Sequence, residues 1–236
     1  RDVVVRDGLA YVADDQQGLH IIDVSAPNAP TLRATWQHPV EPGYALGVAV
    51  AGDHVFLTGA QVGLDIIDVS DPDNPVGVAR YDTDGSALDV AVAGDYAYVA
   101  DDWGGLVILD VSDPTNPTWV GTCGDCVPAQ GVSLSGSFAL VAAHSAGVHV
   151  VSVADPAAPT VVASYDTGGF ARRVGRAGNL VLVADEAGGL VVLELGGAGE
   201  YVWANALGGD FTAPENWVPS GPPGPADRAI FDLPDS

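Results

Sequence analysis

Pairs of adjacent acidic residues recur along the chain and could bind a cation. Each pair follows a short apolar run, and the pairs are Asp14-Asp15, Asp101-Asp102 and Asp185-Glu186. Ca²⁺ takes about six to eight oxygen ligands, so carboxylates from several loops could hold it together. The pairs lack the dense alternation of acidic residues found in calcium-binding loops. Asp14, Asp15, Asp185 and Glu186 are therefore weak metal candidates, and the alternative is that these carboxylates cap strand ends and keep the surface hydrated.

Cys123 and Cys126 form a C-x-x-C motif. A redox motif needs its first cysteine at a helix N-terminus, where the pKa of the thiol falls. Here a strand-like run precedes the motif and Val127-Pro128 follows it, so we expect no helix. A zinc site needs four ligands, and no second C-x-x-C is present. We predict a local disulfide between Cys123 and Cys126 in an oxidising compartment, with two free thiols as the alternative.

Side-chain types that suit a ligand occur in one of the acidic-pair loops and in other connecting segments of the chain. Indole rings stack on sugars and other flat groups, while carboxylates, imidazole and guanidinium provide hydrogen bonds. The candidate ligand-binding residues are Trp36, Asp101, Asp102, Trp103, His144, Arg172 and Arg173. No Ser-His-Asp order, glycine-rich phosphate loop or H-E-x-x-H motif is present. We therefore name no catalytic residue and no cofactor, with Ca²⁺ as the one open possibility.

The composition excludes several classes of protein. The 236 residues include 31 acidic and 8 basic ones, for a formal net charge of −23. This charge argues against binding to nucleic acid, because phosphate backbones attract clustered positive charge. The 47% of hydrophobic residues exceed what an acidic disordered chain contains. No apolar run approaches the ~18 residues of a membrane helix, so we expect no membrane insertion in this segment.

An internal repeat positions all of these residues. The segment Gly18-Leu19-His20-Ile21-Ile22-Asp23 has four relatives further along the chain, each with a glycine at its start. The glycines lie at 18, 63, 105, 147 and 189, with spacings of 45, 42, 42 and 42 residues. Such a fixed period indicates one supersecondary unit per repeat.

Each repeat contains four strand-like pieces, as the third repeat shows. Strands are predicted at 88–92, 96–100, 105–111 and 118–122, with turns rich in Gly, Asp and Pro between them. The third strand is apolar on both faces, which suits a sheet packed between two neighbours. Four antiparallel strands in about 42 residues match one blade of a β-propeller. We predict an all-β protein, a β-propeller of about five visible four-stranded blades, which make up either a whole ring or an incomplete one.

The third strands resemble a known family. Leu106-Val107-Ile108-Leu109-Asp110 and its relatives look like the LVIVD repeat, as does the turn that follows them, best seen at Val69–Pro75 and Val111–Pro117. The resemblance covers about residues 2–195 and implies a β-propeller in a bacterial or archaeal surface or secreted protein. No catalytic activity can be transferred from it. We expect an extracellular or cell-surface location, with a signal peptide upstream of this fragment.

The period ends after the fifth repeat. We predict a propeller over 1–196, a glycine-rich linker over 197–200, and the start of a second β module or a cap over 201–236. The last segment contains Trp203, Asn216-Trp217 and a Pro-Gly-Pro turn. It resembles the opening of autotransporter-like β-helix segments.

The blade geometry sorts the loops by face. In a propeller blade the loops between strands two and three lie on the same face as the segments joining successive blades. We call this the loop face, and it contains all the ligand candidates. The favoured function is a non-enzymatic scaffold that presents this face to a protein or a glycan. The alternatives are a hydrolase or lyase using Asp2 or Asp89 with Arg172 or Arg173 at the channel mouth, and a Ca²⁺-stabilised adhesive module.

Overall fold

Strands make up almost all of the regular structure in the computed structural model. The structure describes residues 1–39, 44–196, 202–203, 217–218 and 230–232. In these residues the helical elements are two single turns of 3₁₀ helix, η1 (Ala60–Val62) and η2 (Glu186–Gly188). No helix in this part of the chain has the length and apolar character needed to cross a membrane. The chain divides into two compact units, residues 1–129 with 156–158, and residues 130–155 with 159–236.

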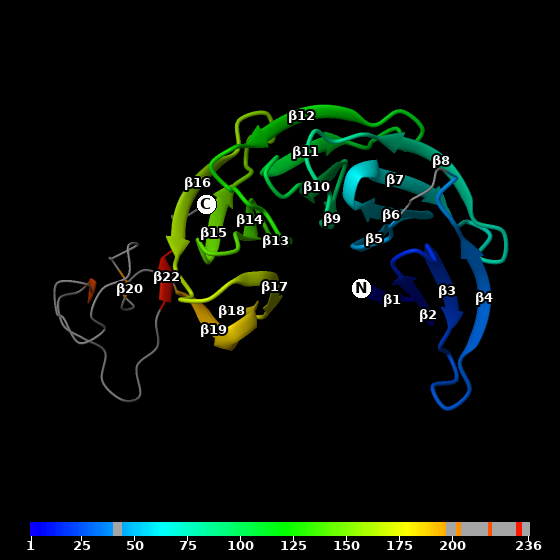
Figure 1. Ribbon diagram of the computed structural model, residues 1–236, viewed down its shortest axis with the longest axis horizontal. Coiled ribbons are helices and arrows are strands. Elements are labelled where there is room, and N and C mark those ends of the chain that lie inside the picture. Colours follow the sequence, from blue (N-terminus) through cyan, green and yellow to red (C-terminus); the bar gives the residue numbers. More distant parts are fainter. Residues whose placement is uncertain (40–43, 197–201, 204–216, 219–229, 233–236) are drawn as a thin grey trace. The chain divides into compact units, whose positions relative to one another are not determined.

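The first unit contains three four-stranded antiparallel sheets, each with its strands in chain order (Figure 1). Blade 1 is β1 (Asp2–Arg6), β2 (Leu9–Ala13), β3 (Leu19–Asp23) and β4 (Thr31–Trp36). Blade 2 is β5 (Val48–Ala51), β6 (His54–Gly59), β7 (Gly63–Asp68) and β8 (Val76–Tyr81). Blade 3 is β9 (Asp89–Ala93), β10 (Tyr96–Ala100), β11 (Leu106–Asp110) and β12 (Thr118–Cys123).

The second unit contains two further sheets. Blade 4 is β13 (Gly131–Ser135), β14 (Phe138–Ala142), β15 (Val148–Ser152) and β16 (Thr160–Tyr165). Blade 5 has β17 (Ala171–Ala177), β18 (Leu180–Asp185) and β19 (Gly189–Gly196) in antiparallel order. The short strand β22 (Ile230–Asp232) pairs in parallel with β19, and β20 (Val202–Trp203) and β21 (Trp217–Val218) extend that sheet.

The repeat pattern explains the blade geometry. The third strands β7 and β11 are buried along nearly their whole length, as their apolar sequences predict. The aspartate that ends the third strand accepts the first hydrogen bond of the following turn. Asp110 Oδ1 lies 2.9 Å from the backbone nitrogen of Ser112, and Asp68 Oδ1 lies 2.8 Å from that of Ser70. The backbone bonds end the strand in an Asx turn. The pKa of Asp110 is lowered by bonds from the hydroxyl and then the nitrogen of Ser112, and that of Asp68 by bonds from the nitrogen and then the hydroxyl of Ser70.

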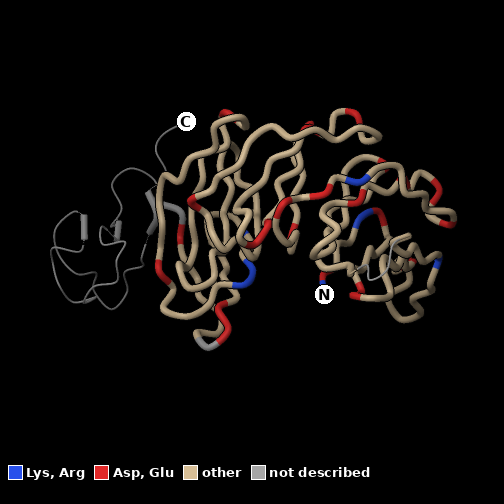
Figure 2. Tube along the Cα trace, turned by 45° about the horizontal axis from the view of Figure 1, so that its top comes forward, with Lys and Arg blue, Asp and Glu red and all other residues tan. Residues whose placement is uncertain are grey.

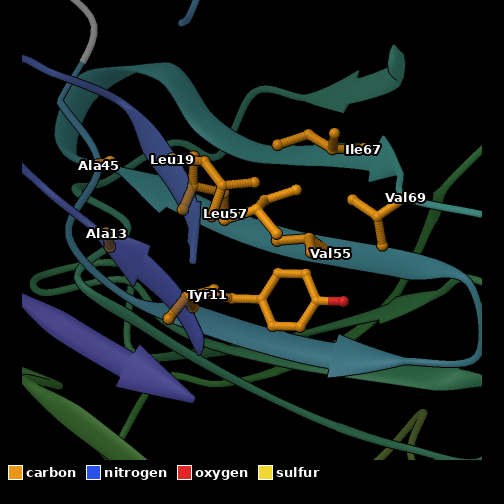
Figure 3. Packing of buried hydrophobic residues seen from close by; sticks show 10 residues of the cluster. Tyr11, Ala13, Leu19, Ala45, Val55, Leu57, Ile67 and Val69 are labelled. Carbon is orange, nitrogen blue, oxygen red and sulfur yellow. The ribbon is translucent and has the colours of Figure 1, made fainter. Parts of the chain in front are cut away.

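Successive blades of the first unit pack face to face through apolar side chains. Between blades 1 and 2, Tyr11, Leu19 and Ile21 meet Val55, Leu57 and Ile67 (Figure 3). Between blades 2 and 3 a second cluster contains Phe56, Leu64, Ile66, Val90, Val99 and Leu109. This core leaves the loops at the blade ends to carry polar residues, and Figure 2 shows how strongly acidic residues outnumber basic ones along the trace.

The predicted fold class is confirmed as all-β, with five blades of the β-propeller type. In the third repeat the predicted strands agree with β9–β12 to within one residue at each end. The predicted linker at 197–200 lies outside the described residues. Most of the segment 201–236 also lies outside them, so the predicted second module and its β-helix resemblance stay predictions.

Candidate functional site

Loop pairings within each unit agree with the expected sorting by face. In the first unit Asp15 forms a β-bridge with Ala45, and Asp102 forms one with Ala129. In the second unit His144 pairs with Ala171 in the same way. Each bridge joins the loop between strands two and three to the segment that leads into the following blade. The loop face is therefore held together by backbone hydrogen bonds.

The carboxylate of Asp101 fastens the preceding interblade segment instead of facing solvent. The residue is fully buried. Its Oδ1 accepts a hydrogen bond from Thr83 Oγ1 at 2.6 Å, and its Oδ2 accepts one from the Gly85 nitrogen at 2.9 Å. Burial raises the pKa of Asp101, and these two bonds partly oppose that rise. The predicted ligand residue Asp101 thus holds the interblade segment in place by these two hydrogen bonds, an arrangement that we call a clasp.

Asp185 repeats this clasp in blade 5. Its Oδ1 accepts a hydrogen bond from Thr167 Oγ1 at 2.7 Å. The residue is fully buried, and a side chain at Gly169 or Gly188 would collide with its carboxylate. The two clasps have the same separation in sequence, since Thr83 and Thr167 each precede their aspartate by 18 residues.

The second residue of each acidic pair has left-handed backbone geometry, and so does His144 at the same position of its loop. Asp15 and Asp102 both have φ of 48°, and His144 and Glu186 have φ of 50° and 21°. Aspartate tolerates this region better than most residues. The backbone turn therefore explains the residue type at Asp15 and Asp102 without a ligand.

Two arginines form equivalent ion pairs with these residues. Arg1 Nη2 lies 2.7 Å from Asp15 Oδ2, and Arg172 Nε lies 2.6 Å from Glu186 Oε1. Arg172 also donates from Nη1 to Gln130 Oε1 at 2.9 Å. A register shift between Ala171 and Arg173 makes Arg172 the extra residue of a β-bulge, which directs its side chain to these partners. Arg173 begins the regular pairing of β17 and is partly buried.

His144 lies against Phe170 in the second unit. The two ring centroids are 4.5 Å apart with an interplanar angle of 31°. Phe170 is 42% exposed, so this pair forms a small aromatic surface at the loop face.

The described metal candidates do not converge. Asp14 Oδ2 lies 3.2 Å from His20 Nε2, and Asp15 and Glu186 are paired with their arginines. In the part of the chain that the structure describes, no three His, Cys, Asp or Glu side chains come together as a metal site would require.

Trp36 is used in packing between blades 1 and 2. Its ring contacts the backbone of β8, because a side-chain carbon at Gly77 would lie 3.0 Å from Trp36 Cζ2. Its ring meets His38 edge to face, with centroids 6.2 Å apart. This predicted ligand residue therefore fills a groove in the adjacent blade.

His38 continues into a buried ionic cluster in blade 2. Its Nε2 lies 3.2 Å from Asp65 Oδ2, while Arg80 Nε lies 3.0 Å from Asp65 Oδ1. Asp65 is only 5% exposed. Burial raises the pKa of Asp65, and the hydrogen bond from Arg80 and the charge of His38 act against that rise.

Blade 3 has an open pocket at the corresponding place. Its volume is about 170 Å³. The lining residues come from the end of β8, the β8–β9 segment, the β10–β11 loop and strands β11 and β12. They are Tyr81, Asp82, Thr83, Asp84, Asp101, Gly104, Val107, Trp119 and Thr122. The indole of Trp119 is 58% exposed and donates to Thr122 Oγ1 at 3.0 Å. The sequence candidate Trp103 lies in the same loop as Asp101 and Gly104 and is 74% exposed.

Sequence reasoning missed most of this pocket. Of the ligand candidates predicted from the sequence, Asp101 alone lines the pocket. The lining residues Tyr81, Asp82, Asp84 and Trp119 were not among those candidates. One signal was present, because Trp119 stands at a repeat position occupied by Leu32, Gly77 and Val161 in the other copies.

Cys123 and Cys126 are both buried next to each other at the end of β12. A hydrogen bond between the two sulfurs raises the pKa of Cys126 and lowers that of Cys123. The segment that follows is a turn and not a helix, as expected. The structure holds both cysteines as free thiols, and the predicted disulfide stays a prediction.

The LVIVD repeat model matches residues 1–37, 42–83, 84–125 and 128–167, more than half of the chain. The chain belongs to the LVIVD repeat family. The family resemblance expected over about residues 2–195 is thereby confirmed, with matches to four repeats within residues 1–167. The comparison with curated proteins found no match.

Solved structures share the fold of this LVIVD repeat protein at low sequence identity. A functionally unknown protein from Desulfotomaculum acetoxidans DSM 771 is 13% identical with a TM-score of 0.63, over 85% of this chain and 74% of that one. The β-propeller domain of Cps50 (Swd1) from Myceliophteria thermophila is 12% identical with a TM-score of 0.61, over 79% and 66%. The designed Ika8 protein is 8% identical with a TM-score of 0.63, over 81% and 57%. The chain thus spans little more than half the length of Ika8, and these likenesses concern the fold alone.

Proposed function

We propose that this LVIVD repeat protein is a non-enzymatic binding module, outside the cell or on its surface, that recognises a protein partner. The observation that carries this proposal is the surface of blade 3. The exposed Trp119 lines a pocket together with Asp82 and Asp84, and a second exposed indole, Trp103, comes directly before the lining residue Gly104 in the chain. Tryptophan is among the residues that contribute most binding energy in protein interfaces.

The pairing of the polar residues supports binding over catalysis. The carboxylate of Asp101 is occupied by Thr83 and Gly85, and Arg172 by Glu186 and Gln130. A general acid and base pair would need two carboxyls in contrasting environments facing a shared space. The exposed aromatic and acidic groups of blade 3 provide contact area and charge instead.

The net charge narrows the class of partner. With a formal net charge of −23, the protein attracts cationic partners and repels acidic ones.

The proposed location rests on the LVIVD family resemblance and on the cysteine pair, which would suit an oxidising compartment.

The pocket size favours a protein over a glycan or a large small molecule. Pockets for drug-sized ligands have volumes of roughly 300–1,000 Å³. The pocket of about 170 Å³ is smaller and suits a single side chain of a larger partner. A glycan partner would need a longer open platform of aromatic rings.

The test is a screen of the purified protein against peptide arrays of basic, acidic and neutral composition, with a glycan array in parallel. We expect saturable binding to basic peptides, reduced by roughly tenfold or more in Trp103→Ala, as for an interface hot spot. Phe170→Ala is the matched control, because it removes an exposed aromatic ring from the second unit. Selective glycan binding with blank peptide arrays would replace the protein partner by a carbohydrate. Blank arrays of both kinds would overturn the proposal.

A further inference from the structure

The blade 3 pocket has a filled counterpart one repeat earlier in the chain. Trp36 and Tyr81 each end a fourth strand, and they pair with Leu19 and Leu64 of their own third strands. The same strand register aligns other positions of the two repeats. His38, two residues after Trp36, corresponds to Thr83, two residues after Tyr81. The cross-strand pair Asp65–Arg80 of blade 2 corresponds to the cross-strand pair Val107–Thr122 of blade 3.

In blade 2 this groove is occupied by an internal aromatic and an imidazole. Trp36 lies over Gly77, and His38 reaches Asp65 at 3.2 Å. The side chain of His38 is only 7% exposed there. The groove of a blade in this protein can therefore hold a flat, positively chargeable side chain against a carboxylate.

In blade 3 two substitutions within the repeat leave the groove open. Asp101 stands where blade 2 has Gly59, and it holds Thr83 by a 2.6 Å hydrogen bond. Trp119 stands where blade 2 has Gly77, so an indole lines the space that Trp36 covers in blade 2. The segment that leads from blade 2 to blade 3 is held at the edge of the groove by the bond between Thr83 and Asp101. The groove therefore remains as a pocket of about 170 Å³.

The lining of the pocket has the chemistry of a site for an organic cation. Asp82 and Asp84 supply carboxylates, and Trp119 and Tyr81 supply aromatic surface. None of its lining residues is basic. A cation over an indole face is attracted by the ring, and arginine is the side chain most often found in such contacts. Its planar guanidinium can also donate two parallel hydrogen bonds to one carboxylate.

We propose that the blade 3 pocket binds a single arginine side chain of a partner protein, with the guanidinium between Trp119 and the carboxylates of Asp82 and Asp84. This inference rests on the proposed function and names the group that the partner inserts. Lysine fits the charge but lacks the flat shape, so it binds more weakly. Citrulline, which has the shape without the charge, does not bind.

The test follows the indole N–H signals of the whole protein by NMR during titration with three small probes. The probes are N-acetyl-arginine amide, N-acetyl-lysine amide and N-acetyl-citrulline amide. The Trp119 signal is assigned as the one that disappears in the variant Trp119→Leu. Leucine is chosen because Leu32 occupies the same repeat position in blade 1. We expect the arginine probe to shift the Trp119 signal most, the lysine probe less and the citrulline probe not at all.

Variants locate the site. Asp84→Asn should weaken arginine binding by roughly threefold to thirtyfold, within the range of a charge contact beside an aromatic ring. Asp95→Asn is the matched control, because it removes the same charge from the exposed β9–β10 turn of the same blade. Thermal melting of each variant checks that the fold is intact. Equal shifts with citrulline, or equal weakening in Asp84→Asn and Asp95→Asn, would overturn the inference.

The two proposals fail in different ways. If basic peptides bind on the array but Trp119→Leu and Asp84→Asn leave that binding unchanged, the arginine pocket is wrong and the binding function stands. If the arginine probe shifts Trp119 while the arrays stay blank, the pocket stands and the peptide-binding function is wrong.

Discussion

Gly77 and Trp119 occupy the same position in the fourth strands of two successive blades. Gly77 pairs with Ile67 and Trp119 pairs with Leu109, in each case beside the β-bulge of the strand pair. The absence of a side chain at Gly77 lets Trp36 lie on the strand. The indole at Trp119 instead lines an open pocket. One repeat position therefore separates a packed blade junction from a candidate binding site.

The first prediction concerns the pH dependence that Asp101 gives to stability. Burial raises the pKa of this carboxyl in the folded protein, with Asp84 and Asp102 adding to the rise. The folded state therefore binds this proton more tightly than the unfolded chain, whose Asp pKa is about 3.9. The stability from Asp101 is present below that value and is lost as pH rises through the folded pKa.

Asp101→Asn should therefore gain stability relative to the wild type as pH rises above about 4. Urea unfolding at several pH values measures this difference. Asp110→Asn is a control of opposite sign, because bonds from Ser112 lower the pKa of Asp110. That variant should lose stability relative to the wild type as pH rises towards neutrality. If the unfolding free energies of both variants followed the same pH dependence as that of the wild type, the prediction would be contradicted.

The second prediction concerns the ionic cluster of blade 2. Arg80→Met removes the 3.0 Å contact to Asp65 and leaves a buried carboxylate with less compensation. We expect a loss of roughly 3 kcal/mol, at the lower end of the range for a broken buried pair, because Arg80 itself is partly exposed. The double variant Arg80→Met with Asp65→Leu should recover much of this loss. Additive losses in chemical denaturation would show that the two side chains do not act as a pair.

The third prediction concerns Ca²⁺. The predicted weak ligands have partners of their own in the structure, Arg1 for Asp15 and Arg172 for Glu186. We expect the same melting temperature in millimolar Ca²⁺ and in chelator, since a ligand stabilises a protein only when it binds the folded state preferentially. A rise in melting temperature with Ca²⁺ but not with Mg²⁺ would contradict this expectation and support the hypothesis of a Ca²⁺-stabilised adhesive module.

The fourth prediction concerns Cys123 and Cys126. Under air, we expect a disulfide between them, seen by mass spectrometry of the denatured protein as a mass lower by two hydrogens and as a lack of alkylation. Because the loop that it closes is short, reduction should lower the melting temperature only slightly. The variant Cys123→Ser with Cys126→Ser serves as the reference for this shift. Full alkylation of the air-exposed protein without a reductant would support two free thiols instead.

The sequence alone was sufficient to predict the blades. The features that define a blade interact only with residues nearby in the chain or across a short hairpin. They are the glycine at the start of the third strand, the apolar run after it and the Asp-Ser turn. Asp110 and Ser112, for example, are two residues apart and form their Asx turn without help from another blade. Such local rules repeat with the period of the sequence, so the repeat could be recognised and its strands placed.

The tertiary structure decided which candidates face a ligand. Asp101 turns inward because Thr83 and Gly85, about 16–18 residues earlier, reach its carboxylate. Trp36 is covered because Gly77, in the next blade, leaves room for it. Trp119 and Tyr81 form a pocket only because the segment between their blades is held at its rim. These outcomes depend on one blade meeting a neighbouring blade or the segment between them in space, and the pattern of the repeat does not reveal such contacts.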